Sequence, residues 1–174
     1  MMLIKFIGAA LVLLASAAGG LYFGAADTFR QNDLIQFKQA LAILKGDIGF
    51  ALSTLPEAMA QMAARTGEPL RRIFGQFSLA LEEGNGGEVD KLWARCLDDN
   101  ARLTYFNAED LAALKQFGKA LGFLDKNMQL GNIEMTTEYL DAQIAALNDS
   151  KRKSRRMYQS LCVLTGLLVV VILF

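Results

Sequence analysis

Residues 32–52 read NDLIQFKQALAILKGDIGFAL, and this stretch decides the expected fold. Its apolar residues recur at alternating steps of three and four, a spacing that lines one face of an α-helix. The stretch therefore predicts an amphipathic helix that buries one face. The residues on that face are Leu34, Phe37, Leu41, Leu44 and Ile48.

The next helix has start signals of its own in TLPEAMAQMAARTG, residues 54–67. Thr54 and Glu57 have the spacing of a capping box, and Pro56 lies in the first turn, where its missing N–H costs little. Gly67 is expected to close this helix in a left-handed conformation, as glycine often does at a helix end.

The rest of the chain continues the helical pattern, with almost no strand signal. Two helices are expected within 68–84 and 87–103, separated by a GNGG loop at residues 84–87. Asn107 is a cap for a helix that Gly122 ends, and a last helix is expected to run from about Asp125 to the end of the chain. The sequence thus predicts an all-α protein. The inward residues of the two middle helices are Leu70, Ile73, Phe74, Phe77, Leu81, Val89, Leu92, Trp93, Cys96 and Leu97.

Both ends of the chain are apolar. Residues 3–24 carry one charge, Lys5, and are long enough to span a hydrocarbon core of about 30 Å. We therefore expect an N-terminal transmembrane helix at 1–26, a helical bundle at 27–156 and a C-terminal transmembrane helix at 157–174. The alternative for the first segment is a cleaved signal peptide.

A cationic collar precedes the second apolar end. Positive charge beside a span marks the cytoplasmic side, so the collar places the bundle in the cytoplasm. The stretch from Asp27 to Asp149 holds all 18 acidic residues but only 12 of the 18 cations, which excludes a basic nucleic-acid-binding face. The collar consists of Lys151, Arg152, Lys153, Arg155 and Arg156.

No catalytic set is visible in the sequence. The chain has no histidine, which removes His-based triads and zinc sites. The acidic pairs, such as Glu109 and Asp110, are adjacent and point in different directions on a helix, so they are expected on solvated faces. Cys96 and Cys162 are too far apart to suggest a disulfide. We therefore expect no catalytic residue, no metal and no cofactor.

Several stretches together resemble the stage III sporulation protein AB family. They are MMLIKFIGAALVLLA at 1–15, LYFG at 21–24, QALAILKGDIGFALSTLPEAM at 39–59, PLRRIF at 69–74, ALGFLDKNMQ at 120–129, YLDAQI at 139–144 and RRMYQSLCVLTGLLVVVILF at 155–174. The resemblance implies a six-helix bundle like the cytoplasmic F-domain of the platform proteins of type II secretion and type IV pilus machines, flanked by the two transmembrane helices.

The resemblance also implies a location and partners. The chain would be an integral protein of the outer forespore membrane, with its bundle on the mother-cell side. It would act as a platform component of a channel complex with other stage III sporulation proteins, and a homo-oligomer is one expected form. The expected partner is a secretion-type ATPase, stage III sporulation protein AA.

The alternative is an exported, tail-anchored helical binding protein released from a signal peptide. The expected partner surface consists of Glu57, Arg71, Arg72, Asp98 and Asp99.

Overall fold

The computed structural model describes residues 2–50, 53–84, 88–122 and 125–173, and it describes side chains within 26–153. In these ranges all regular structure is helical. The elements are α1 (Met2–Phe50), α2 (Leu55–Arg65), α3 (Leu70–Glu82), α4 (Val89–Asn100), the 3-10 helix η1 (Ala101–Leu103), α5 (Ala108–Gly118) and α6 (Lys126–Leu173). The predicted all-α class, with six α-helices in the described part, is confirmed.

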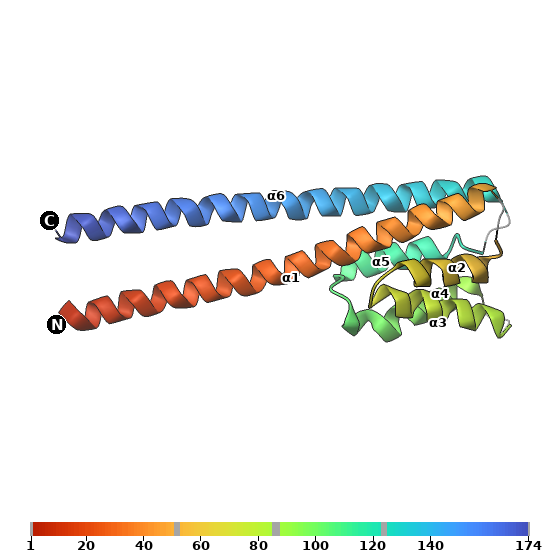
Figure 1. Cartoon of the computed structure of the whole chain (residues 1–174), viewed down its shortest axis with the longest axis horizontal. Helices are drawn as coiled ribbons and strands as arrows, with labels where there is room; N and C mark the ends of the chain where they lie inside the picture. Colours follow the sequence, from red (N-terminus) through yellow and green to blue (C-terminus); the bar gives the residue numbers. More distant parts are fainter. Residues whose placement is uncertain (1, 51–52, 85–87, 123–124, 174) are drawn as a thin grey trace.

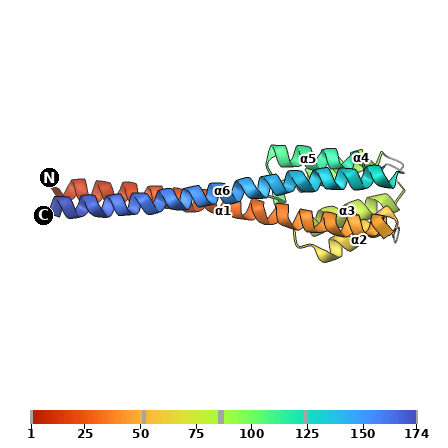
Figure 2. The same ribbon diagram turned by 90° about the horizontal axis from the view of Figure 1, so that it is seen from above.

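The long helices α1 and α6 are close together beside the short helices and separate toward the chain ends, which are at the same end of the molecule (Figure 1). The four short helices gather near the opposite end. Seen from above, α4 and α5 lie to one side of the long pair, and α2 and α3 lie to the other (Figure 2). We call the assembly of α2, α3, α4, η1 and α5 on this end the head.

Each long helix is continuous across a boundary that the sequence suggested. α1 runs without a break through residues 26 and 27, and α6 runs through residues 156 and 157. The expectation that the last helix extends to the end of the chain is confirmed as far as Leu173.

We expected an integral membrane protein with two spans, and the structure contradicts this location. Across the residues that the structure describes, no helix combines the length and apolar character that a membrane crossing needs. The physical reason is that α1 and α6 carry charges at short intervals where their side chains are described, as with Asp27, Arg30 and Asp33. The two spans were expected at 1–26 and 157–174, and the side chains of 1–25 and 154–174 lie outside the described residues.

Local signals explain where the head helices begin. Thr54 and Glu57 form the expected capping box of α2, in which the Glu57 Oε2 accepts from the Thr54 N–H at 2.8 Å. Asn107 and Asp110 form a second box at the start of α5. Here the Asp110 N–H donates to Asn107 Oδ1 at 2.7 Å, and the Asn107 N–H donates to Asp110 Oδ2 at 3.0 Å. Both predicted caps are confirmed.

Two predicted helix ends are wrong. Gly67 does not adopt a left-handed conformation, because α2 already ends at Arg65 and Thr66 is extended, with its hydroxyl donating to the Met62 carbonyl at 2.8 Å. α5 ends at Gly118 rather than at Gly122, because the N–H groups that follow it form tighter turns, as with the Leu121 N–H to the Gly118 carbonyl at 3.1 Å.

An aromatic cluster fills the core between α1 and the head. Trp93 of α4 is fully buried, and its indole N–H donates to the Leu114 carbonyl of α5 at 2.7 Å. Its ring lies 5.1 Å from Phe77 and 6.0 Å from both Phe74 and Phe117, measured between centroids. Such offset and edge-to-face pairs add stability beyond the area that they bury. Phe37 of α1 belongs to the same cluster, with its ring centroid 5.5 Å from Phe74 and 6.2 Å from Trp93, so the cluster fixes the head against α1.

The inward face predicted for residues 32–52 is largely confirmed. Leu34, Phe37, Leu41 and Leu44 are fully buried, and Ile48 is partly buried against the same core. Leu70, Ile73, Phe74, Phe77, Trp93, Cys96 and Leu97 are also buried, while Leu81, Val89 and Leu92 are partly buried.

Candidate functional site

A buried polar network joins α1, α5 and α6. Arg30 makes a two-pronged contact with Asp110, from Nε to Oδ2 at 2.7 Å and from Nη2 to Oδ1 at 2.9 Å. Tyr139 Oη donates to Asp110 Oδ1 at 3.1 Å, and Arg30 Nη2 also donates to Gln143 Oε1 at 3.0 Å. Asp110 has no exposed side-chain surface, so the expectation of a solvated Glu109–Asp110 pair is wrong for Asp110. Its carboxylate faces inward because it closes the cap of α5 and meets Arg30.

The protonation of this network favours a fixed ion pair. The hydrogen bond to Asp110 raises the pKa of Arg30, and burial, together with the charge of Asp110, raises the pKa of Tyr139 to about 12. Both groups therefore keep their protons at neutral pH. Because every polar atom named here has a partner, the network acts as a clamp between three helices.

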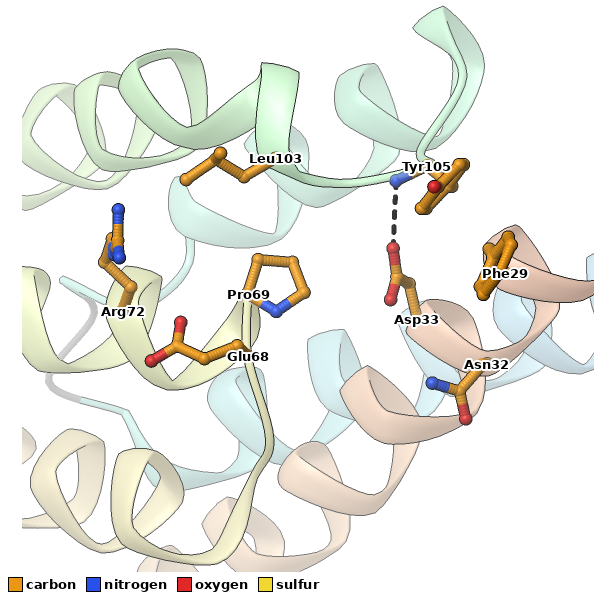
Figure 3. Close-up of a pocket in the computed structure, with 8 residues that line it drawn as sticks. All are labelled: Phe29, Asn32, Asp33, Glu68, Pro69, Arg72, Leu103 and Tyr105. Atoms are coloured by element: carbon orange, nitrogen blue, oxygen red, sulfur yellow. Dashed lines mark hydrogen bonds between the residues drawn. The ribbon is translucent and has the colours of Figure 1, made fainter. Parts of the chain in front are cut away.

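An open pocket lies where α1, the start of α3 and the loop between η1 and α5 meet (Figure 3). Its volume is about 360 Å³. One wall holds Phe29 and Tyr105, whose rings stack with centroids 4.9 Å apart and an interplanar angle of 22°. Both residues are about half exposed, at 51% and 49%. The pocket therefore presents aromatic surface that the fold itself does not cover.

The loop sequence explains how Tyr105 reaches this pocket. Thr104 has extended backbone, and in an extended segment successive side chains point to opposite sides. Phe106 accordingly enters the core, with 8% exposure, while Tyr105 faces outward. The Tyr105 N–H donates to Asp33 Oδ2 at 2.9 Å, which fixes the loop against α1.

Asp33 forms the floor of the pocket and is 4% exposed. Burial raises its pKa, while the Tyr105 N–H opposes that shift. Glu68 and Arg72 lie on the other wall, on either side of Pro69 along the chain. Both are exposed, and within the part of the chain whose side chains are described neither forms an ion pair. The pocket thus combines aromatic surface with charges that lack internal partners.

The structure distributes the expected partner surface over several positions. Glu57 is used in the cap of α2, which lowers its pKa through the Thr54 N–H. Asp98 pairs with Lys115 at 2.6 Å, and Asp99 and Arg71 are exposed. Only Arg72 of this set lines the pocket.

The collar is partly described. The Lys151 ammonium donates to Gln31 Oε1 at 2.5 Å, which ties α6 to α1. Arg152 and Lys153 are exposed. The side chains of Arg155 and Arg156 lie outside the described residues.

The fold and the pocket define an all-helical scaffold with two long antiparallel helices, a small head and an open surface site. The chain belongs to the stage III sporulation protein AB family, whose sequence pattern matches residues 5–174. It is 27% identical over 171 residues to stage III sporulation protein AB of Bacillus subtilis (strain 168), covering 98% of this chain and 99% of that protein.

A solved structure of stage III sporulation protein AB (SpoIIIAB) has the same fold. It superposes with a TM-score of 0.67 at 25% identity and covers 72% of this chain and 98% of the solved chain. The family is one of sporulation proteins, and its name denotes a stage of sporulation rather than a reaction.

Sequence reasoning missed Phe29, Asp33 and Tyr105 as site residues. Phe29 lies outside the buried face of the helix that Leu34 and Phe37 define. A large aromatic residue outside that face was the sequence signal that could have indicated a surface site. Asp33 and Tyr105 gave no signal, because they are 72 residues apart and meet only in the folded chain.

Proposed function

We propose that this protein is a non-enzymatic docking component of the stage III sporulation machinery. Its work would be to hold a helical bundle, residues 27–156, as a contact surface for a secretion-type ATPase, stage III sporulation protein AA. Family membership supports the sporulation role. The choice of the ATPase as partner follows from the resemblance to the platform proteins of secretion machines.

The observation that carries this proposal is the pocket with its uncovered Phe29–Tyr105 pair. Aromatic residues and arginine are enriched where proteins meet, and a half-exposed aromatic pair beside charges without internal partners is typical of such a surface. By contrast, the buried polar network is closed by its own hydrogen bonds. The pocket is therefore the part of the described surface best suited to a partner.

The rigidity of the head supports the same proposal. Phe29 projects from α1 and Tyr105 from a loop that hydrogen-bonds to α1 through Asp33. Arg30 follows Phe29 in the sequence, and its ion pair with Asp110 fixes α5 to α1. A surface held in this way loses little conformational freedom on binding, which favours association.

The test is co-purification of the full chain with the ATPase, with no nucleotide, with ADP and with a non-hydrolysable ATP analogue. We expect association in at least one of these states and its reduction by Tyr105→Ala. Leu79→Ala is a matched control, because Leu79 is a large apolar side chain, 60% exposed, that does not line the pocket. Absence of association in every nucleotide state would refute the proposal. Light scattering of the same samples reports whether the chain self-associates.

A further inference from the structure

We propose that the pocket of Phe29, Asp33, Glu68 and Tyr105 receives an arginine side chain of the docking partner. The guanidinium would pair with the Asp33 carboxylate and lie against the exposed side of the Phe29–Tyr105 stack. This inference rests on the proposed docking function and names the chemistry by which the pocket would recognise its partner.

Asp33 is the first argument for a cation. It is 96% buried by area, since only 4% is exposed, yet it lines the pocket. One carboxylate oxygen, Oδ2, accepts from the Tyr105 N–H at 2.9 Å. Across the described residues, no hydrogen bond reaches the other oxygen, and that oxygen is not among the fully enclosed atoms left without a partner. It therefore faces the pocket, as Figure 3 shows, and offers an incoming donor a site.

The aromatic pair is the second argument. A cation within about 6 Å of an aromatic face is attracted by the ring, and arginine also stacks in plane on such faces. Phe29 and Tyr105 form one nearly parallel stack beside Asp33 (Figure 3). A planar guanidinium satisfies both features together, because it donates in its plane and presents flat faces to the rings. An ammonium group lacks that planar geometry.

The distribution of charge in the pocket is the third argument. Asp33 and Glu68 supply two carboxylates against the single guanidinium of Arg72. In Figure 3, Pro69 lies between Arg72 and Asp33, so the cation of the pocket is on the far side of the proline ring from the buried carboxylate. The end formed by Asp33 and the aromatic pair is therefore complementary to positive charge.

The size of the pocket agrees with one side chain and its surroundings. Its volume is about 360 Å³, and ligand sites in proteins begin at roughly 300 Å³. The pocket is open to solvent, which suits a residue carried on a partner's surface rather than an enclosed free metabolite.

The first experiment titrates the isotopically labelled full chain with N-acetyl-arginine amide and follows the Tyr105 amide resonance by NMR. The Tyr105 N–H reports directly because it bonds to Asp33. We expect saturable binding with a dissociation constant on the order of millimolar, as suits a single side chain. Two control ligands separate charge from shape. The citrulline amide has a planar side-chain group of the same shape but no charge, and the lysine amide has a positive charge but no planar group. Both are expected to bind at least about tenfold more weakly than the arginine amide.

Variants locate the binding site. Asp33→Asn keeps an oxygen that can accept from the Tyr105 N–H. It should weaken the binding of N-acetyl-arginine amide at least about tenfold, because the charge that pairs with the guanidinium is lost. Glu68→Gln removes an exposed charge and should weaken the binding of the arginine amide by about threefold. This variant still tests the inference if Asp33→Asn does not fold. Glu138→Gln, a matched exposed carboxylate on α6 that does not line this pocket, should bind as the wild type does. Arg72→Ala should bind equally or more tightly.

Four results would overturn the inference. They are the absence of saturable binding, equal binding of arginine and citrulline amides, equal binding of arginine and lysine amides, and loss of binding in Arg72→Ala. Co-purification with the ATPase separates this inference from the proposed function. If Asp33→Asn and wild type retain the ATPase equally, docking stands and the arginine pocket fails. If arginine amide binds but no ATPase associates, the choice of partner fails instead.

Discussion

Among the glycines whose surroundings the structure describes, Gly118 is the position at which one added methyl group should do most damage. It is the last residue of α5, and a Cβ built on it would lie 1.9 Å from Cδ1 and 2.6 Å from Cγ of Trp93. Carbon atoms in contact normally lie about 3.5–4.0 Å apart, so the indole ring would have to retreat by roughly 1.5–2 Å. The ring is fully buried and in contact with Phe74 and Phe77, so its displacement would disturb these neighbours.

The expected cost follows from two losses and one gain. Forcing extra volume into a packed core typically costs about 1–3 kcal/mol. Moving the ring also breaks the 2.7 Å hydrogen bond from the Trp93 indole to the Leu114 carbonyl, for about 1–3 kcal/mol. Replacing glycine in a helix returns at most about 1 kcal/mol. Gly118→Ala should therefore lower the free energy of unfolding by about 1–5 kcal/mol.

Urea unfolding followed by tryptophan fluorescence measures this change, because Trp93 is the only tryptophan and reports its own displacement. Gly131→Ala is the matched control, since a Cβ there meets nothing within 4 Å, and it should stabilise the protein by up to about 1 kcal/mol. The penalty of Gly118→Ala should shrink in a Trp93→Leu background, measured by circular dichroism. A Gly118→Ala variant as stable as wild type, with unchanged emission, would refute the reasoning.

The polar residues give three more expectations. Asp110→Asn should cost about 3–5 kcal/mol in urea unfolding, because it leaves Arg30 without its anion, and a loss below about 1 kcal/mol would contradict the clamp. Tyr139→Phe should remove a tyrosine that titrates near pH 12 in ultraviolet difference spectra. Since the folded pKa of Tyr139 is raised, wild type should lose stability between about pH 10 and 12 and the variant should lose less. Asp33→Asn should raise the melting temperature at neutral pH, because burial raises the pKa of Asp33 and its charged form disfavours folding. That advantage should shrink at acid pH as Asp33 is protonated, and a constant difference across pH would count against this account.

Local patterns in the sequence carry much of the fold. The three-four spacing around Leu34 and Phe37 identified the buried face of α1, and the signals at Thr54 and Asn107 identified the starts of two helices. These features depend on residues within four positions of one another. Helix ends were less predictable, because the end of α5 is set by turns after Gly118 rather than by the glycine at 122.

The candidate site could not be predicted in the same way, because it depends on long-range contacts. Its residues come from three segments, around 29–33, 68–72 and 103–105. The burial of Asp110 likewise depends on Arg30, which is 80 residues away. An acidic residue beside another acid looks solvated in sequence, and only the partner across the fold shows that it is enclosed.

The pairing of α1 with α6 has a mechanical consequence. Each helix is about 70 Å long at 1.5 Å per residue, and both extend from the head toward the same end. A sideways force on the head would stretch one helix and compress the other, so bending requires the two to slide past each other. The ion pair of Lys45 with Glu134 and the hydrogen bond from Gln31 to Asn148 join the two helices at well-separated points and oppose that sliding. Over the stretch that these contacts join, the pair should therefore resist bending more strongly than either helix alone.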